Sequence, residues 1–207
     1  MLSRSVFHSA AIGALLLCSM SGASAQSVTD VPSVDLIDDA FIADLEVMLN
    51  SPVIHHAIDH QNEVRANISQ AEIDALDQSW RAETQTDGAQ PVITAALGAP
   101  ASTYLLRAQA SSKGLLSEIF VMDRHGLNVA QSSVTSDFWQ GDEAKYQRTF
   151  PQGAGAVFID EPEFNAEVGV WLTQVNLTID QGGTPIGVGT VEVNLSELAR
   201  LRVYEGS

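Results

Sequence analysis

Apolar residues in the first half of the chain recur at the three- and four-residue spacing of helix faces. The first such face comprises Ile37, Phe41, Leu45 and Met48. Ser33 is suited to cap this helix, with Asp35 in its first turn. Ser51 and Pro52 then predict the cap and first residue of a second helix, or a kinked continuation of the first.

A capping box gives the clearest helix start. Ser69-Gln70-Ala71-Glu72 has the residue types and spacing of the box, and the apolar stripe that follows comprises Ile73, Leu76 and Trp80. Residues 84–100 are rich in Gly, Pro, Thr and Ala and predict loops with a short helical turn at 92–97, and another short helix is predicted at 101–110. Residues 26–110 are therefore predicted to be mainly helical.

The pattern changes to alternation after residue 111. Five strands are predicted, at 118–122, 127–132, 156–160, 168–179 and 186–195. The turn Asp123-Arg124-His125-Gly126 joins the first two, and the Gly-rich turn at 180–185 joins the last two. A short helix carrying Glu197, Arg200 and Arg202 ends the chain. Helices that precede an antiparallel sheet predict an α+β domain over residues 26–207, with residues 111–207 mainly sheet.

The N-terminus has the pattern of a cleaved signal peptide at residues 1–25. Arg4 precedes a short apolar run, and Ala23-Ser24-Ala25 fits the small-x-small cleavage pattern. Cleavage would remove Cys18, the only cysteine of the chain. An exported domain without a disulfide is typical of a bacterial periplasm, and we expect no membrane span once the signal is cleaved.

The formal net charge of −16 narrows the classes of partner. A strongly negative field repels nucleic acid and anionic lipid, so we expect neither as a partner. It also disfavours an anionic ligand unless a local cation compensates. The simplest interpretation of the bulk charge is solubility.

Residues 136–147 combine aromatic, amide and charged side chains and form the first candidate ligand site. Trp139 and Tyr146 could wall a pocket, and Lys145 could hold a carboxylate. The side chains suited to orienting an amine or hydroxyl are Gln140, Asp142 and Glu143. If the segment is helical, Trp139, Asp142 and Tyr146 share one face. The alternative is that the aromatics are core anchors, Asp142 is a helix cap and Lys145 is solvated.

A second candidate group lies on the following strands. It comprises Asp160, Trp171 and Gln174. Asp160 ends an apolar strand and could bind an ammonium group, although a turn carboxylate explains it equally. Trp171 on an apolar face is more typical of a core.

Three histidines raise a metal hypothesis. His56 and His60 lie four residues apart on a predicted helix, with His55 beside them. A His-Glu-x-x-His pattern is absent from the sequence, and surface histidines explain the cluster more simply. The sequence also lacks a Gly-x-Ser-x-Gly elbow and a phosphate-binding loop, so we predict neither an enzyme nor a cofactor.

Three segments resemble the single Cache family of extracellular PAS-like sensor domains (PDC-like). They are residues 118–126 with their Asp-x-x-Gly turn, residues 128–132, and the Asp-Phe-Trp-Gln-Gly-Asp-Glu-Ala-Lys run at 137–145; residues 182–188 are also similar. The resemblance implies N-terminal helices packed on a five-stranded antiparallel PAS-like sheet that binds small metabolites. The chain resembles a free-standing periplasmic form of the family, which implies a membrane sensor kinase, chemoreceptor or transporter as the partner. The resemblance also implies helix-mediated homodimers.

Our first hypothesis is therefore a periplasmic module that binds a small polar or carboxylic metabolite and relays its ligand state to a membrane partner. The second is a ligand-independent protein-interaction module of the same fold. The third is a metal-dependent hydrolase that uses the histidines.

Overall fold

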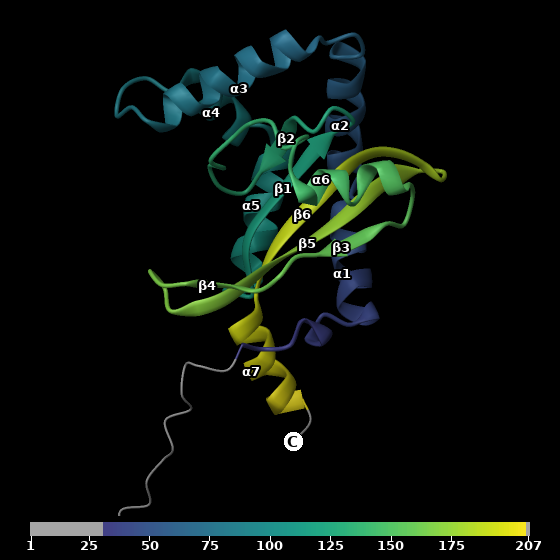
Figure 1. The fold of residues 1–207 in the computed structure, drawn as a ribbon, viewed down its shortest axis with the longest axis vertical. Helices are drawn as coiled ribbons and strands as arrows, with labels where there is room; N and C mark the ends of the chain where they lie inside the picture. The colour runs from purple at the N-terminus through teal and green to yellow at the C-terminus, as the bar shows by residue number, and fades with distance from the viewer. Residues whose placement is uncertain (1–30, 206–207) are drawn as a thin grey trace, which may run out of the picture. The chain divides into compact units, whose positions relative to one another are not determined.

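The computed structural model describes residues 31–205, and the predicted signal peptide lies outside these residues. Helical elements occupy the first part of the described chain (Figure 1). They are the 3₁₀ helix η1 (Val34–Leu36) and the helices α1 (Asp39–Leu49), α2 (Pro52–Val64), α3 (Gln70–Thr84), α4 (Pro91–Leu97) and α5 (Pro100–Ser111). This order confirms the predicted α+β organisation, with helices before the sheet.

Of the three helix starts predicted from capping residues, two agree with the structure and one differs. Ser69 and Glu72 form the predicted capping box, with the Ser69 N–H 2.8 Å from the Glu72 carboxylate. Ser51 is extended, so α2 is a separate helix rather than a continuation of α1. The prediction for Ser33 was wrong, because this residue caps only η1. α1 begins later, where the Asp38 side chain accepts the N–H of Phe41 at 2.8 Å.

The sheet has one strand more than predicted. Its members are β1 (Leu116–Asp123), β2 (Asn128–Gln131), β3 (Val157–Ile159), β4 (Glu163–Asn165), β5 (Val170–Gln181) and β6 (Thr184–Asn194). All pairings are antiparallel, and the strand order is β2-β1-β6-β5-β3. β4 also pairs with β5, at residues 170–172, whereas β3 pairs with residues 175–177. The sequence did not indicate β4, because this strand is short, polar and directly follows Pro162.

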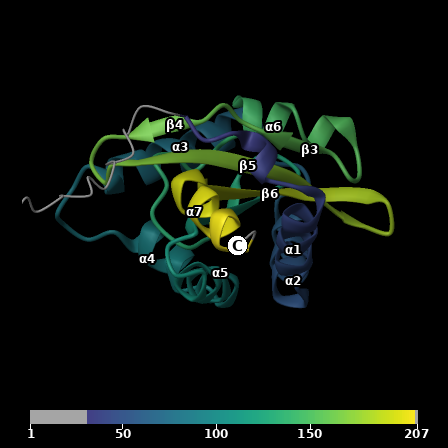
Figure 2. The ribbon, with the colours of Figure 1, turned by 90° about the horizontal axis from the view of Figure 1, so that it is seen from below.

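Helices α1, α2 and α5 cover one face of the sheet (Figure 2). Their buried residues, including Leu49, Ile58 and Leu105, form the main hydrophobic core with the inward side chains of the central strands. Gly189 on β6 makes the close contact with α1 possible. A Cβ atom at this position would lie 2.5 Å from the side chain of Leu49. The glycine therefore serves helix–sheet packing.

The opposite face of the sheet is only partly covered. The short helix α6 (Ala144–Gln147) and the 3₁₀ helix η2 (Phe150–Gln152) lie over the centre of this face. Tyr146 and Phe150 pack there on Phe120, Met122 and Val188. The sheet face beside this small cluster remains accessible, and it carries the candidate site.

The C-terminal helix α7 (Leu195–Glu205) follows β6 without an intervening loop. Leu195 and Leu198 are buried in the main core, and Ser196 Oγ accepts the backbone N–H of Trp171 at 2.9 Å. Among the described residues, no helix has both the length and the apolar character that a membrane span requires.

Candidate functional site

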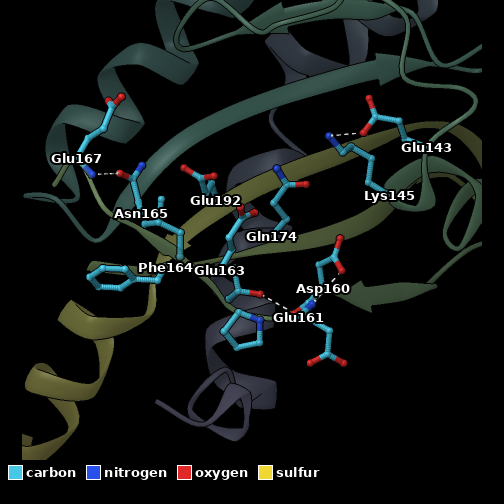
Figure 3. A pocket seen from close by; sticks show the side chains of 13 residues that line it. Glu143, Lys145, Asp160, Glu161, Glu163, Phe164, Asn165, Glu167, Gln174 and Glu192 are labelled. Atoms are coloured by element: carbon cyan, nitrogen blue, oxygen red, sulfur yellow. Dashed lines mark hydrogen bonds and ion pairs between the residues drawn. The ribbon is translucent and has the colours of Figure 1, made fainter. Parts of the chain in front are cut away.

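A cleft of about 800 Å³ opens on the sheet face opposite the main core. Its floor is formed by β5 and β6, one wall by α6 and the residue before it, and the other by residues 160–167, which include β4. The lining side chains are those of Glu143, Lys145, Asp160, Glu161, Pro162, Glu163, Phe164, Asn165, Glu167, Leu172, Thr173, Gln174 and Glu192 (Figure 3).

The strand register brings the polar groups of the floor into one row. Gln174 on β5 lies opposite Glu192 on β6, and Glu192 lies opposite Glu118 on β1. Asp160 continues the row beyond β5, because its N–H donates to the carbonyl of Gln174 at 2.9 Å. The next row consists of Phe120, Thr190, Asn176 and Phe158. Its two polar side chains are buried, and Thr190 Oγ1 donates to Asn176 Oδ1 at 2.8 Å. The polar groups that remain accessible on the floor are therefore those of the Gln174 row.

Lys145 is the cation of the cleft lining, and it is already held by neighbouring groups. Its Nζ lies 2.9 Å from the carboxylate of Glu143 and donates to Gln140 Oε1 at 3.1 Å. The same ammonium group lies 5.4 Å from the ring centroid of Phe120. Two of the three N–H donors of Lys145 thus have partners within the protein.

The cleft is strongly acidic. Its carboxylates are those of Glu143, Asp160, Glu161, Glu163, Glu167 and Glu192, and Lys145 is the single cation among the lining residues. Burial raises the pKa of Glu192, and the nearby Glu118 and Glu163 raise it further, whereas Lys145 acts in the opposite direction. The electrostatics of the cleft favour a cation over an anion.

Trp139 and Gln140 lie outside the cleft lining and connect the loop before α6 to the β1–β2 turn. The indole Nε1 of Trp139 donates to the His125 carbonyl at 2.9 Å, and the Gln140 N–H donates to the Gly126 carbonyl at 2.8 Å. Gly141 is required beside them, since a Cβ there would lie 2.5 Å from the Trp139 Nε1. The Trp-Gln-Gly sequence therefore has a structural explanation, and Gln140 reaches the site only through Lys145.

Tyr146 is also engaged within the fold. Its hydroxyl donates to the carbonyl of Arg124, and its ring stacks on Phe150 with centroids 5.3 Å apart. Burial raises the pKa of Tyr146 to about 12, with a smaller contribution from Asp123. The hydroxyl is thus a neutral donor at physiological pH.

The expectation of a common helical face for Trp139, Asp142 and Tyr146 was wrong. α6 begins only at Ala144, because the preceding residues make loop and bridge contacts with the β1–β2 turn. Asp142 is exposed in that loop.

Trp171 lies outside the cleft lining as well: it packs against the main core and contacts the ring of Phe164, with centroids 5.3 Å apart.

Four of the nine candidate ligand-site residues therefore line the cleft. They are Glu143, Lys145, Asp160 and Gln174. Sequence reasoning did not select Glu192, although the predicted hairpin between the last two strands places it near Gln174. Counting the register back from the hairpin turn would have paired Gln174 with Val191, because a β-bulge between Ile179 and Asp180 shifts the register by one residue.

The histidines of the metal hypothesis lie outside the cleft. His56 and His60 are exposed on α2 and line a separate groove of about 480 Å³ between α2 and the start of α5. Within residues 31–205, no three His, Cys, Asp or Glu side chains are grouped as a metal site would require.

The chain matches no protein-family model and no curated protein. Solved structures similar to it include the ligand-binding domain of the Campylobacter jejuni chemoreceptor Tlp3 in complex with 4-methylisoleucine. The identity is 13%, the TM-score is 0.38, and the match covers 79% of this chain and 66% of that one.

Two further structures have comparable values. The extracellular domain of the putative histidine kinase vpHK1S-Z8 is 11% identical with a TM-score of 0.41, over 79% of this chain and 52% of that one. The ligand-binding domain of the Pseudomonas aeruginosa PAO1 amino acid chemoreceptor PctC, in complex with GABA, is 11% identical with a TM-score of 0.38, over 78% and 64%. This chain thus spans between about half and two thirds of their lengths. Two of these three structures are ligand-binding domains of chemoreceptors, and the third is an extracellular domain of a putative histidine kinase.

Proposed function

We propose that this protein is a periplasmic small-molecule sensor module whose cleft binds a small polar metabolite through an ammonium group. The observation that carries the proposal is the cleft of about 800 Å³, whose lining contains six carboxylates and one lysine. A cavity of this size suits a small metabolite, and its polar groups converge on a floor with apolar neighbours.

The state of Lys145 favours an ammonium group as the main anchor. An anion would have to compete with Glu143 and Gln140 for the lysine and would face the remaining carboxylates. The third donor of Lys145 can still hold the carboxylate of a zwitterion. Amino acids and related amino carboxylates therefore fit as well as simple amines, whereas dicarboxylates do not.

An organic ammonium fits the lining better than a bare metal ion. Metal ions need several oxygen atoms converging at 2.0–2.6 Å, and the described carboxylates have no such grouping. An ammonium group requires only a few acceptors at hydrogen-bond distance, and Asp160, Gln174 and Glu192 provide them from adjacent strands.

The link between β6 and α7 supports the proposed relay to a membrane partner. Glu192 on the cleft floor precedes the first residue of α7 by three positions, with no loop between them. A shift of β6 on ligand binding would therefore reach α7 directly. The partner in this proposal is a sensor kinase, a chemoreceptor or a transporter.

The proposal is tested with four compounds that share one carbon frame and differ in charge. They are 1,4-diaminobutane, 4-aminobutanoate, 1,4-butanediol and succinate. We expect the thermal midpoint of the purified protein to rise with the diamine and the amino acid, and to stay unchanged with the diol and succinate. A ligand at one hundred times its dissociation constant adds about 2.7 kcal/mol of stability. For a domain of this size, each kcal/mol shifts the midpoint by about 2 to 4 °C.

Two variants test whether the thermal shift arises from binding in the cleft. Asp160→Asn removes a cleft carboxylate and should reduce the shift with the diamine, whereas Asp180→Asn makes the same change in the β5–β6 turn and should leave it unchanged. A shift with succinate alone would contradict the ammonium proposal. No shift with any of the four compounds would also contradict it, and would favour the protein-interaction module, for which the internal packing of Trp139 and Tyr146 is the supporting observation.

A further inference from the structure

Glu192 on the cleft floor lies directly opposite a second glutamate, Glu118, which is outside the cleft lining. Glu118 on β1 is the register partner of Glu192 on β6, and both side chains are partly buried. Partners in an antiparallel pair have Cβ atoms about 4.5 to 5.5 Å apart, and like charges in such positions repel. The charge of Glu118 therefore disfavours the charged form of Glu192.

The groups packed around Glu192 compensate this repulsion only in part. From β5, Gln174 contributes a neutral amide; from β4, Glu163 adds another negative charge. Lys145 approaches from α6 but is paired with Glu143. Asp160, at the far end of the row, is a further carboxylate.

Glu118 has a compensating hydrogen bond of its own. Ser133 Oγ donates to Glu118 Oε1 at 2.6 Å, which holds the Glu118 side chain in place. We assign Glu192 as the group of the cleft floor that takes up a proton. The raised pKa of Glu192, caused by burial and then by Glu118, agrees with this assignment.

We propose that Glu192 is the specificity-determining residue of the cleft: in the ligand-free protein it takes up a proton more readily than an ordinary glutamate, and an ammonium group that binds beside it displaces that proton. This inference rests on the proposed function. The O–H bond of the Glu192 carboxyl group breaks, its proton passes to the solvent buffer, and the carboxylate accepts an N–H of the ligand. At most one proton is released for each ligand bound.

The proposed exchange makes amine binding depend on pH. Below the pKa of Glu192 the ligand competes with a proton, so its apparent affinity falls by up to tenfold for each pH unit. Above that pKa the affinity becomes independent of pH. A neutral ligand such as the diol gains nothing from this exchange, which is why Glu192 would select for cations.

The first experiment needs no ligand. We would follow the side-chain carboxyl carbon of Glu192 by NMR during a pH titration of the whole protein. We expect a midpoint clearly above the ordinary value of about 4.3. Glu118→Gln should lower this midpoint, and Glu167→Gln, which removes a charge from the cleft wall, should change it less. A Glu192 titration midpoint at the ordinary value, or one that stays unchanged in the Glu118→Gln variant, would overturn the proposal.

The second experiment measures proton release directly. Calorimetric titration with 1,4-diaminobutane, in two buffers of different ionisation heat, should show release of up to one proton near the Glu192 midpoint. Glu192→Gln should abolish the release and weaken binding at least tenfold at neutral pH.

The outcomes separate the two proposals. If the diamine binds without proton release and Glu192→Gln binds it normally, the inference about Glu192 fails and the proposed function stands. If Glu192 titrates at a high midpoint but the diamine does not bind, the proposed function fails and the role of Glu192 as a cation selector fails with it.

Discussion

Asp123 is fully buried at the end of β1, and its carboxylate organises the β1–β2 turn. One oxygen accepts the backbone N–H groups of His125 at 2.8 Å and Leu127 at 3.0 Å. The other accepts Gln61 Nε2 at 2.8 Å and lies 3.9 Å from Arg65 Nη1. The turn is thereby fixed to α2, which carries Gln61.

We predict that Asp123→Asn destabilises the protein by about 3 kcal/mol. The amide oxygen still accepts the two backbone N–H groups, but the new NH₂ group faces Gln61 Nε2, so that two donors oppose each other. Rotating the Gln61 amide would break its weaker bonds to the carbonyls of Leu127 and Asn128, at 3.4 and 3.2 Å. The substitution also leaves the largely buried Arg65 without its charge partner.

Thermal and urea unfolding at pH 7 measure this cost. At about 2 to 4 °C for each kcal/mol, the midpoint should fall by about 6 to 12 °C. Asp180→Asn is the matched control, since Asp180 also accepts a turn N–H, from Gly183 at 2.7 Å, but in an exposed hairpin. Its cost should stay below about 1 kcal/mol. Equal destabilisation by the two substitutions would refute the reasoning.

Three further substitutions test other contacts. Gly187→Ala should lower the unfolding free energy by at least about 1 to 3 kcal/mol, because the new Cβ would lie 2.2 Å from a β1 backbone carbonyl; wild-type stability would contradict this packing. Trp139→Phe removes the bond to His125 and should cost about 1 kcal/mol in urea unfolding, with diamine binding retained; loss of binding in a folded protein would place Trp139 in the site. The pKa of Asp77 is lowered, because hydrogen bonds from Arg81 and two backbone N–H groups outweigh the effect of burial. Asp77 therefore contributes stability above the ordinary carboxyl range, which is lost as pH falls through its lowered pKa. Asp77→Asn should narrow the difference between unfolding free energies at pH 7 and pH 3, and an unchanged difference would contradict this role.

Most of the fold could be predicted because its signals are local. The capping box at Ser69, the proline after Ser51 and the alternation along β5 each depend on residues close in sequence. β4 escaped prediction because its three residues gain their strand conformation from pairing with β5. Tertiary pairing rather than intrinsic preference determines that element.

The site was predicted less completely, for a related reason. Trp139 and Tyr146 have the composition of pocket walls, yet their polar atoms bond to carbonyls of the β1–β2 turn, which no local pattern reveals. Glu192 was missed because its significance comes from its cross-strand neighbours. Glu192 can be recognised as a site residue only once the strand register is known, which places Glu118 and Gln174 on either side of it.

The strand that comes last in the chain lies in the middle of the sheet. β6 pairs with β1 on one side and β5 on the other, so both remain unpaired along one edge until residues 184–194 have left the ribosome. The β1–β6 contacts join segments that are distant in sequence and form slowly, since a long loop must close before they contribute. Completion of the sheet therefore requires that residues 184–194 have been synthesised. A chain that stops before β6 would expose two strand edges and would tend to aggregate rather than persist as a partly folded domain.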